Sequence, residues 1–391
     1  MIPRDSETTI RQLLQAFPVV TITGPRQSGK TTLARHVCPD KPYLSLEDPD
    51  VRQRALDDPR AFLEQLPDGA VLDEIQRAPD LLSYLQTRVD ADGRMGLFLL
   101  TGSQQLGLMS SITQSLAGRT AFLELLPFSI QELDKAGMRP KALDTMLFMG
   151  GYPPLYDRDL TPQRWFPAYV TAYIERDVRQ LLNVQDLETF QRFVRFCAGR
   201  SGQILNLSAL ASDCGITHNT AKAWISVLEA SYILFLLPPH HVNFNKRLIK
   251  SPKLYFYDTG LMCWLLGIRD VAQLATHPLR GSIFETLIVS ELAKTGFNRG
   301  EHLDMHFWRD RSGNEVDVIM DTGTKLMPIE IKAGQTINRE FFSALERWVT
   351  LAGGQAVSPT LIYGGTSTYH HKGIHVYGWN NTGQVLTMLT G

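Results

Sequence analysis

Short apolar runs alternate with helical patterns along the first 140 residues, and each run ends in glycine or in polar side chains. The run at 17–22 precedes a glycine turn, the run at 70–72 precedes two acids, and the run at 97–100 precedes a threonine, a glycine and a serine. Consecutive apolar residues indicate strands that are buried on both faces, as in a parallel sheet. We therefore predict an α/β fold whose polar chemistry gathers at the carboxyl edge of that sheet.

The turn after the first run has the spacing of a phosphate-binding loop. Residues 24–31 read GPRQSGKT and match G-x-x-x-x-G-K-[ST] at every fixed position. Glycine lets backbone N–H groups curve around phosphate oxygens, and the helix that begins near Gly29 turns its positive end toward the same anion. Lys30 can reach the β- and γ-phosphates, and the Thr31 hydroxyl can bind Mg²⁺. The alternative is a glycine-rich turn with a surface lysine.

Two further strand ends complete the predicted nucleotide site. Asp73 would bind Mg²⁺ directly or through water, and Glu74 would orient or deprotonate the attacking water. Thr101 or Ser103 could contact the γ-phosphate or that water. A solvated strand end would be the simpler interpretation of the acid pair alone, but its position after the phosphate loop favours the site. The predicted contacts to the nucleotide are Gly24, Pro25, Arg26, Gln27, Ser28, Gly29, Lys30, Thr31, Thr32, Asp73 and Ser103.

The middle of the chain has a different pattern. Aromatic residues recur at helical spacing and are expected in a core, namely Trp165, Phe166, Tyr169 and Tyr173. Further along, Ser208 would cap a short helix at 209–213, and Thr217 would cap a second helix at 218–230. A strand at 232–237 follows. This order resembles a winged helix-turn-helix with its wing in 240–257, whose second helix would enter the DNA major groove by its first residues. Those residues are Thr217, His218, Asn219, Thr220 and Lys222.

Charge supports that interpretation. The whole chain has a net charge of −1, which excludes a uniformly basic nucleic-acid coat protein but not a local basic patch. Between residues 190 and 255 there are eight basic residues and two acidic ones, a local charge of +6 that suits a phosphate-contacting face. The alternatives are a winged helix used only for packing or protein contact, and a solvated wing.

The last third of the chain holds a second set of chemical residues. Glu285 lies in an amphipathic helix at 281–292, Asp317 lies in a hairpin, and Glu330 and Lys332 share one face of a strand. This order resembles the PD-(D/E)xK nuclease core, in which Asp317 and Glu330 would hold Mg²⁺ with Glu285 as a third acid. Lys332 would position or activate the water for phosphodiester attack. Converging carboxylates need a cation or a proton. Alternation of charges on exposed strands, or an inactive nuclease-like fold, would leave the same pattern.

Several stretches together are similar to one family of prokaryotic AAA-type ATPases that carry a C-terminal domain of unknown function. They read GPRQSGKTTL, YLSLEDPDVRQRALDDPRAFL, VLDEIQRAPDLLSYLQ, FLLTGSQQ, SLAGRTAFLELLPFSIQEL, GGYPPLY and YIERDVRQL. The resemblance implies an ATP-binding fold of the extended AAA class, often ring-forming, with ATP and Mg²⁺ as ligands. It also agrees with a nuclease-like C-terminal domain. It supplies no established biological task.

Ring ATPases usually need an arginine from a neighbouring subunit. Arg119, in a stretch that follows the strand ending at Ser103, is the first candidate for that role. Arg77, just after the acid pair, is a rival, and a surface arginine is the alternative for each.

These patterns predict three domains. They are a P-loop AAA-type ATPase domain (1–140), a helical and winged helix-turn-helix segment (141–255) and an α/β restriction-endonuclease-like domain (256–391). Four widely spaced cysteines without a CxxC pair favour reduced thiols and a cytoplasmic protein, and no apolar run is long enough for a membrane span. We expect an ATPase that forms homo-oligomers and acts on DNA. The alternative is a nucleotide-gated switch that binds a protein partner through an inactive C-terminal domain.

Overall fold

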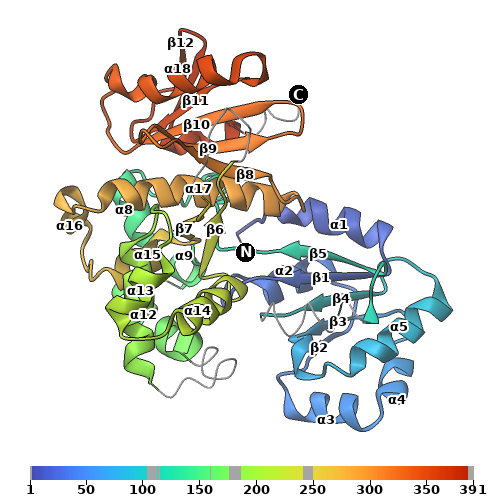
Figure 1. Ribbon diagram of the computed structural model, residues 1–391. Helices are drawn as coiled ribbons and strands as arrows, with labels where there is room; N and C mark the ends of the chain where they lie inside the picture. Colours follow the sequence, from blue (N-terminus) through green and yellow to red (C-terminus); the bar gives the residue numbers. More distant parts are fainter. Residues whose placement is uncertain are drawn as a thin grey trace. The chain divides into compact units, whose positions relative to one another are not determined.

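The computed structural model describes residues 2–103, 112, 115–158, 160–175, 186–240 and 250–385. Contacts divide the chain into two compact units, whose elements are labelled in Figure 1. The first unit comprises Met1–Phe128, Ala230–Tyr232 and Phe297–Glu301, and the second comprises Ser129–Glu229, Ile233–Gly296 and His302–Gly391. In the described ranges, no helix is both long enough and apolar enough to cross a membrane.

Strands and helices alternate along the first unit. Its elements are α1 (Ser6–Ala16), β1 (Val19–Thr23), α2 (Lys30–Val37), β2 (Tyr43–Ser45), α3 (Pro49–Asp57), α4 (Pro59–Glu64), β3 (Ala70–Asp73), η1 (Ile75–Arg77), α5 (Leu81–Asp92), β4 (Phe98–Thr101) and β5 (Thr120–Glu124). The strands form one sheet in the order β2-β3-β4-β1-β5, and every neighbouring pair is parallel. The predicted α/β fold with a parallel sheet is therefore confirmed for this unit.

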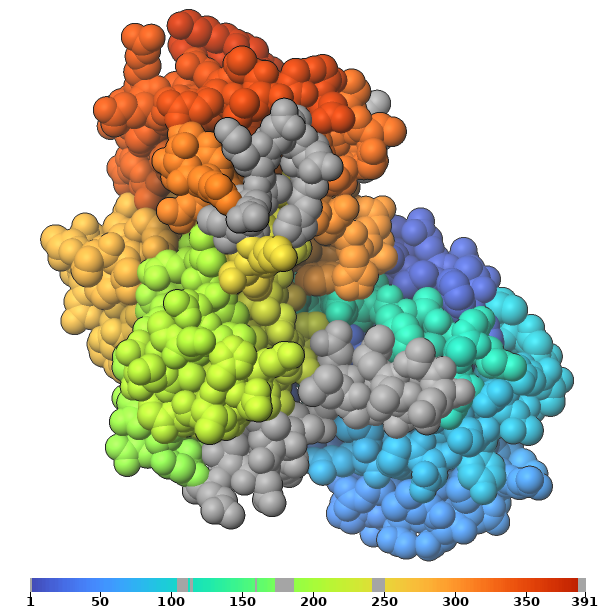
Figure 2. All heavy atoms as spheres, viewed as in Figure 1, coloured from blue at the N-terminus to red at the C-terminus, as the bar shows by residue number. Residues whose placement is uncertain are grey.

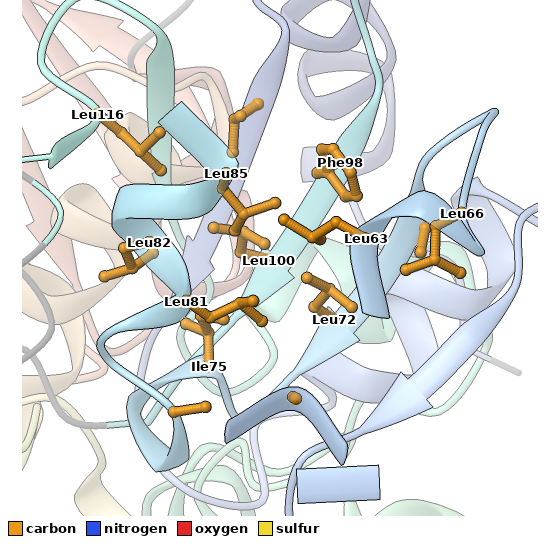
Figure 3. Packing of buried hydrophobic residues seen from close by; sticks show 14 of the residues in the cluster. Leu63, Leu66, Leu72, Ile75, Leu81, Leu82, Leu85, Phe98, Leu100 and Leu116 are labelled. Carbon is orange, nitrogen blue, oxygen red and sulfur yellow. The ribbon is translucent and has the colours of Figure 1, made fainter. Parts of the chain in front are cut away.

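Both faces of this sheet are buried, which explains the continuous apolar runs. On one face, Leu72, Phe98 and Leu100 pack with the leucines of α4 and α5 (Figure 3). On the other face, Val71 and Leu99 pack with the apolar residues of α1 and α2. Because neighbouring strand residues point to opposite faces, each run supplies both cores at once.

The second unit begins with helices and one pair of strands. These elements are α7 (Ile130–Lys135), α8 (Leu143–Met149), α9 (Pro154–Asp157), α10 (Pro162–Tyr169), the π-helix η2 (Val170–Glu175), α12 (Leu187–Gly199), α13 (Leu207–Cys214), α14 (His218–Ala230), β6 (Leu234–Leu237), β7 (Lys253–Phe256), α15 (Thr259–Leu265) and α16 (Val271–Thr276). Strands β6 and β7 are antiparallel. Trp165, Phe166 and Tyr169 are buried, as predicted for a core, whereas the side chain of Tyr173 lies outside the described residues.

A mixed sheet follows in the same unit. Its elements are α17 (Arg280–Asn298), β8 (Met305–Arg309), β9 (Glu315–Asp321), β10 (Leu326–Lys332), α18 (Glu340–Ala352), η3 (Gly353–Gln355), β11 (Thr360–Tyr363), β12 (Tyr369–His371), β13 (Ile374–Gly378) and η4 (Trp379–Gln384). The strand order is β12-β13-β11-β10-β9-β8, with β10, β11 and β13 parallel to one another. Leu345 and Trp348 of α18 belong to the core of this sheet. In Figure 2 the last part of the chain, deep orange to red, forms one continuous surface.

Both helices predicted for this part of the middle segment are present, but the start and the cap of the first one differ from the prediction. Helix α14 begins at His218 as predicted, and the Thr217 hydroxyl accepts a hydrogen bond from Thr220 N at 3.1 Å. Helix α13 starts earlier than predicted, because Asn206 rather than Ser208 caps it by accepting from Ala209 N at 3.0 Å. The predicted strand start at Tyr232 is also wrong. Tyr232 has a φ of 56°, a left-handed conformation that a strand cannot include.

Asp258 is a buried cap that joins two distant parts of the second unit. Its Oδ1 accepts a hydrogen bond from Leu261 N at 2.8 Å, in the first turn of α15, and its Oδ2 accepts from Gly151 N at 2.6 Å. Burial raises the pKa of this carboxyl group. One carboxylate therefore satisfies two buried amides that are more than 100 residues apart in the sequence.

Replacing Asp258 with alanine should lower the free energy of unfolding by about 2–4 kcal/mol, because it removes a helix cap and leaves two buried amides without acceptors. Asp270 is a matched control, since it caps α16 from an exposed position and accepts from Ala272 N at 2.8 Å. Asp270→Ala should cost about 1 kcal/mol. Urea unfolding followed by circular dichroism measures both variants. Equal losses would contradict the special role of Asp258.

Candidate functional site

The loop between β1 and α2 has the backbone that phosphate binding needs. Gly24 has a φ of 141°, and a Cβ there would lie 2.2 Å from Leu125 O, so only glycine fits. Gly29, directly before α2, has a φ of 94°. Lys30 is 5% exposed, and its Nζ donates to the carbonyls of Gly24 at 3.0 Å and Pro25 at 2.7 Å. The lysine thus lies over the loop whose amides are predicted to bind phosphate.

Asp73 is the polar centre of the first unit. At the end of β3, its carboxylate accepts hydrogen bonds from Thr31 Oγ1 at 3.0 and 3.1 Å and from Tyr43 OH at 2.6 Å. Thr101 Oγ1, at the end of β4, also donates to Asp73. Burial is the main cause that raises the pKa of Tyr43, and the hydrogen bond to Asp73 raises it further. The structure therefore brings together the ends of β3 and β4 and the start of α2, and β2 adds Tyr43, which the sequence did not indicate.

Glu74 is held in a strained backbone conformation beside Asp73. Its φ of 58° and ψ of 48° lie in the left-handed region, and its N–H donates to Thr101 Oγ1 at 3.2 Å. Its Oε2 accepts a hydrogen bond from Ser103 Oγ at 3.2 Å and another from Gln76 Nε2. The predicted sensor hydroxyls thus contact the two acids: Thr101 touches Asp73, and Ser103 touches Glu74. Gln76 is a further contact that the motif search missed.

Arg4 supports the phosphate loop from outside the motif. Its guanidinium donates to Ser28 O at 2.8 Å and to Leu126 O at 2.6 Å, and it lies over the Phe128 ring at 4.8 Å from the centroid. Arg4 is buried. No local pattern marks an arginine so far before the loop, so sequence reasoning had no signal for it.

The two candidate arginines occupy different places in the first unit. Arg119 precedes β5, and its carbonyl accepts from Val19 N at the start of β1, so it is at the amino edge of the sheet. Its guanidinium pairs with Asp90 of α5 at 2.8 Å. Arg77 is 3.4 Å from Glu47. A role for either arginine in the site of a neighbouring subunit stays a prediction.

The four residues predicted as a second site lie close together in the second unit. Glu285 is on α17, Asp317 on β9, and Glu330 and Lys332 on β10. Lys332 Nζ pairs with Glu330 Oε1, and Asp317 Oδ2 accepts a hydrogen bond from Ile331 N at 2.8 Å. Burial raises the pKa of Glu285 and of Glu330, and the negative charge of Asp317 raises both further. The carboxyl groups of Glu285, Asp317 and Glu330 therefore lie close together in surroundings with little access to water.

A lysine that the charge count had placed on the DNA-binding face lies inside this acidic cluster. Lys253 of β7 is 2% exposed, and its Nζ is 3.0 Å from Glu285 Oε1 and 3.9 Å from Asp317 Oδ1. It also pairs with Glu315, and Tyr255 OH donates to Glu285 Oε1 at 2.6 Å. Burial lowers the pKa of Lys253, but the carboxylates more than reverse this effect and raise it. Assigning Lys253 to the basic face was therefore wrong.

The two predicted Mg²⁺ sites differ in how well their residues fit a cation. Thr31 and Asp73 are adjacent and offer the hydroxyl and carboxylate oxygens that Mg²⁺ prefers. Within the part of the chain that the structure describes, no three Asp, Glu, His or Cys side chains are arranged to hold a metal ion. Of the predicted trio, Glu285 and Asp317 lie beside Lys253 and Glu330 pairs with Lys332. A metal-binding role for these three acids stays a prediction.

The start of α14 presents polar side chains to solvent. Thr217, His218, Asn219 and Lys222 are all exposed. Elsewhere in the middle segment part of the positive charge is neutralised, since Arg200 pairs with Asp213. The residues predicted as the centre of the wing, 241–249, lie outside the described residues and include two of the basic residues in the charge count.

Comparisons with known proteins define the class of the first unit. A model of the AAA domain (AAA_14) matches residues 16–134. Two domains of unknown function match the rest, DUF8612 at residues 140–272 and DUF4143 at residues 280–381. With the loop and acid pair described above, this match identifies an AAA-type ATPase domain that binds and hydrolyses ATP.

Two known proteins are similar to this chain over most of its length. The uncharacterized proteins Rv2008c of Mycobacterium tuberculosis and Mb2031c of Mycobacterium bovis are each 31% identical over 347 residues, which cover 88% of this chain and 77% of theirs. The chain belongs to the same protein family as these two proteins.

Solved structures show more distant likenesses. The Walker-type ATPase paby2304 of Pyrococcus abyssi is 14% identical, with a TM-score of 0.46 over 68% of this chain and 96% of that one. AMPPCP-bound DnaA from Aquifex aeolicus is 14% identical, with a TM-score of 0.31 over 57% of this chain and 85% of that one.

Tyr43→Phe should raise the Mg²⁺ concentration needed for half-maximal ATP hydrolysis by roughly tenfold, because the hydrogen bond from Tyr43 that orients the Asp73 carboxylate is lost. The exposed Tyr84 of α5 offers the same substitution as a control. The measurement is a Mg²⁺ titration of phosphate release at saturating ATP. If both variants gave the wild-type midpoint, Tyr43 would not orient Asp73.

Proposed function

We propose that this chain is an ATPase that acts on DNA. The AAA domain supplies the hydrolysis, and the observation that carries the DNA part is the exposed polar start of α14, with Lys222, in a segment of net positive sequence charge. A helix that follows a tight turn and exposes its first residues is the arrangement with which helix-turn-helix proteins read the major groove. On this proposal α13, α14 and the β6–β7 pair form the winged helix of the predicted segment 141–255.

The chemistry at the nucleotide site follows from its contacts. The loop amides and Lys30 would bind the phosphates, and Thr31 and Asp73 would hold the ion. When bound, Mg²⁺ neutralises charge that develops on the phosphoryl oxygens. Glu74 accepts the proton of the attacking water, and the hydroxyl of Ser103 fixes the direction in which the carboxylate points. The contacts of Pro25, Arg26, Gln27, Ser28 and Thr32 with the nucleotide belong to the same proposal.

Duplex DNA should stimulate ATP hydrolysis by the wild-type chain, and Lys30→Ala or Glu74→Gln should reduce the rate by at least about a hundredfold, because each removes a group that acts in the transition state. Glu64→Gln is a matched control at an exposed acid of α4. Phosphate release with and without DNA is the measurement. Unchanged hydrolysis in both site variants would refute the assignment of this site. A rate that DNA does not affect would favour the nucleotide-gated switch instead.

Lys222→Ala should weaken DNA binding at all sequences and reduce the slope of log K against log salt by about one, because one phosphate contact is lost. The control is Lys325→Ala, an exposed lysine between β9 and β10 whose Nζ donates to Gly354 O at 2.9 Å. Fluorescence anisotropy with a labelled duplex at several salt concentrations measures both. Identical slopes for wild type and Lys222→Ala would argue against contact through α14.

A second candidate function is supported by Lys253. An acidic cluster that already contains the ammonium group of a lysine suits a C-terminal domain that binds a partner and performs no metal-dependent cleavage. On this hypothesis the chain has the order of the PD-(D/E)xK residues without the activity and works as the nucleotide-gated switch. Four points stay predictions: homo-oligomerisation, the role of Arg119 in the site of a neighbouring subunit, the nuclease activity, and the boundaries 1–140, 141–255 and 256–391.

A further inference from the structure

We propose that the ammonium group of Lys253 is the resident cation of the acidic cluster and excludes divalent metal ions from it. The inference rests on the proposed nuclease-like character of the C-terminal domain and adds a residue from outside the D…ExK pattern that decides whether a metal binds. Lys253 comes from β7 of the middle segment, whereas the acids come from α17, β9 and β10.

The contacts of Lys253 are those of a cation at the centre of the cluster. Its Nζ meets carboxylate oxygens from three different residues, of which Glu285 and Glu315 are in close contact and Asp317 is at 3.9 Å. Ammonium and a divalent ion compete for the same oxygens, and two cations cannot share so small a space without strong repulsion. Lys253 must therefore leave before a metal can bridge Glu285 and Asp317.

The backbone holds this lysine in place from both sides. Lys253 pairs with Leu237 of β6 on one side and forms an isolated antiparallel bridge with Ile204 on the other. Leu254 N also donates to Gln203 O at 3.1 Å. A strand residue fixed on both sides has a fixed side-chain direction, so the ammonium is a built part of the cluster.

One buried oxygen of the cluster has no hydrogen-bond donor. Glu330 is 4% exposed, and among the residues that the structure describes its Oε2 has no partner, although its Oε1 pairs with Lys332. Four carboxylates face two lysines here, namely Glu285, Glu315, Asp317, Glu330, Lys253 and Lys332. A buried carboxylate oxygen without a donor is costly and is the kind of group that a cation would contact. Removing Lys253 leaves a strongly acidic site with an acceptor ready on β10.

The test is Mn²⁺ binding to the full-length, nucleotide-free chain, measured by electron paramagnetic resonance. All proteins carry Asp73→Asn, so that the nucleotide site does not contribute. The Asp73→Asn protein should bind no Mn²⁺ at the cluster. Adding Lys253→Met should create one Mn²⁺ site per chain, with an apparent affinity at least about tenfold tighter than any residual binding by the Asp73→Asn protein. Adding Asp317→Asn as well should abolish this site. Lys325→Met, at an exposed lysine of the same compact unit, should bind like the parent.

Two outcomes would overturn the proposal. One is a Mn²⁺ site in the parent that Asp317→Asn removes, because Lys253 would then not exclude the metal. The other is a folded Lys253→Met protein without a site. If Lys253→Met does not fold, the charge-balanced pair Lys253→Met with Glu285→Gln removes one cation and one anion together and should still bind Mn²⁺ through Asp317 and Glu330. Absence of binding there, with a native circular dichroism spectrum, refutes the idea. None of these readouts depends on ATP or DNA, so failure of the proposed function would be seen separately.

Discussion

A carboxylate taken out of water must be given donors or a cation, and both candidate sites of this chain are built around that requirement. At the end of β3, Asp73 accepts hydrogen bonds from the hydroxyl groups of Thr31, Tyr43 and Thr101. In the C-terminal cluster the ammonium group of Lys253 forms ion pairs with the acids. The elements that supply these partners come from well-separated parts of the sequence, so the sheet and helices of each unit must form before either site exists.

The two solutions have opposite electrostatic consequences. The hydroxyl donors of Asp73 are neutral, so they add no positive charge that would repel a cation. An ammonium group cancels one charge and occupies the position of the cation itself. If Asp73 holds Mg²⁺ as proposed, an acid is a metal ligand in one unit and half of an ion pair in the other, and the partner of the acid makes the difference.

The sequence predicted what depends on local spacing. The strand, the glycine loop and the helix at 19–37 follow one another directly, and parallel strands place Asp73 and Thr101 at the same edge. Contacts between distant residues had no such signal. Tyr43 is 30 residues from Asp73, and Lys253 is 32 residues from Glu285. Nothing in a single sequence says which of many tyrosines or lysines folds back onto a given acid.

The same limit explains why the basic middle segment was overestimated. A charge count treats each lysine and arginine as exposed, whereas burial and pairing decide which charges reach solvent. Lys253 is buried among acids, and Arg200 is paired with Asp213, so neither adds fully to an external field. The exposed basic side chains that the structure describes in this segment are Arg192, Arg195, Lys222 and Lys250. If this face binds DNA as proposed, its exposed basic side chains would contact phosphate and position the protein, whereas the polar residues at the start of α14 would read the base edges.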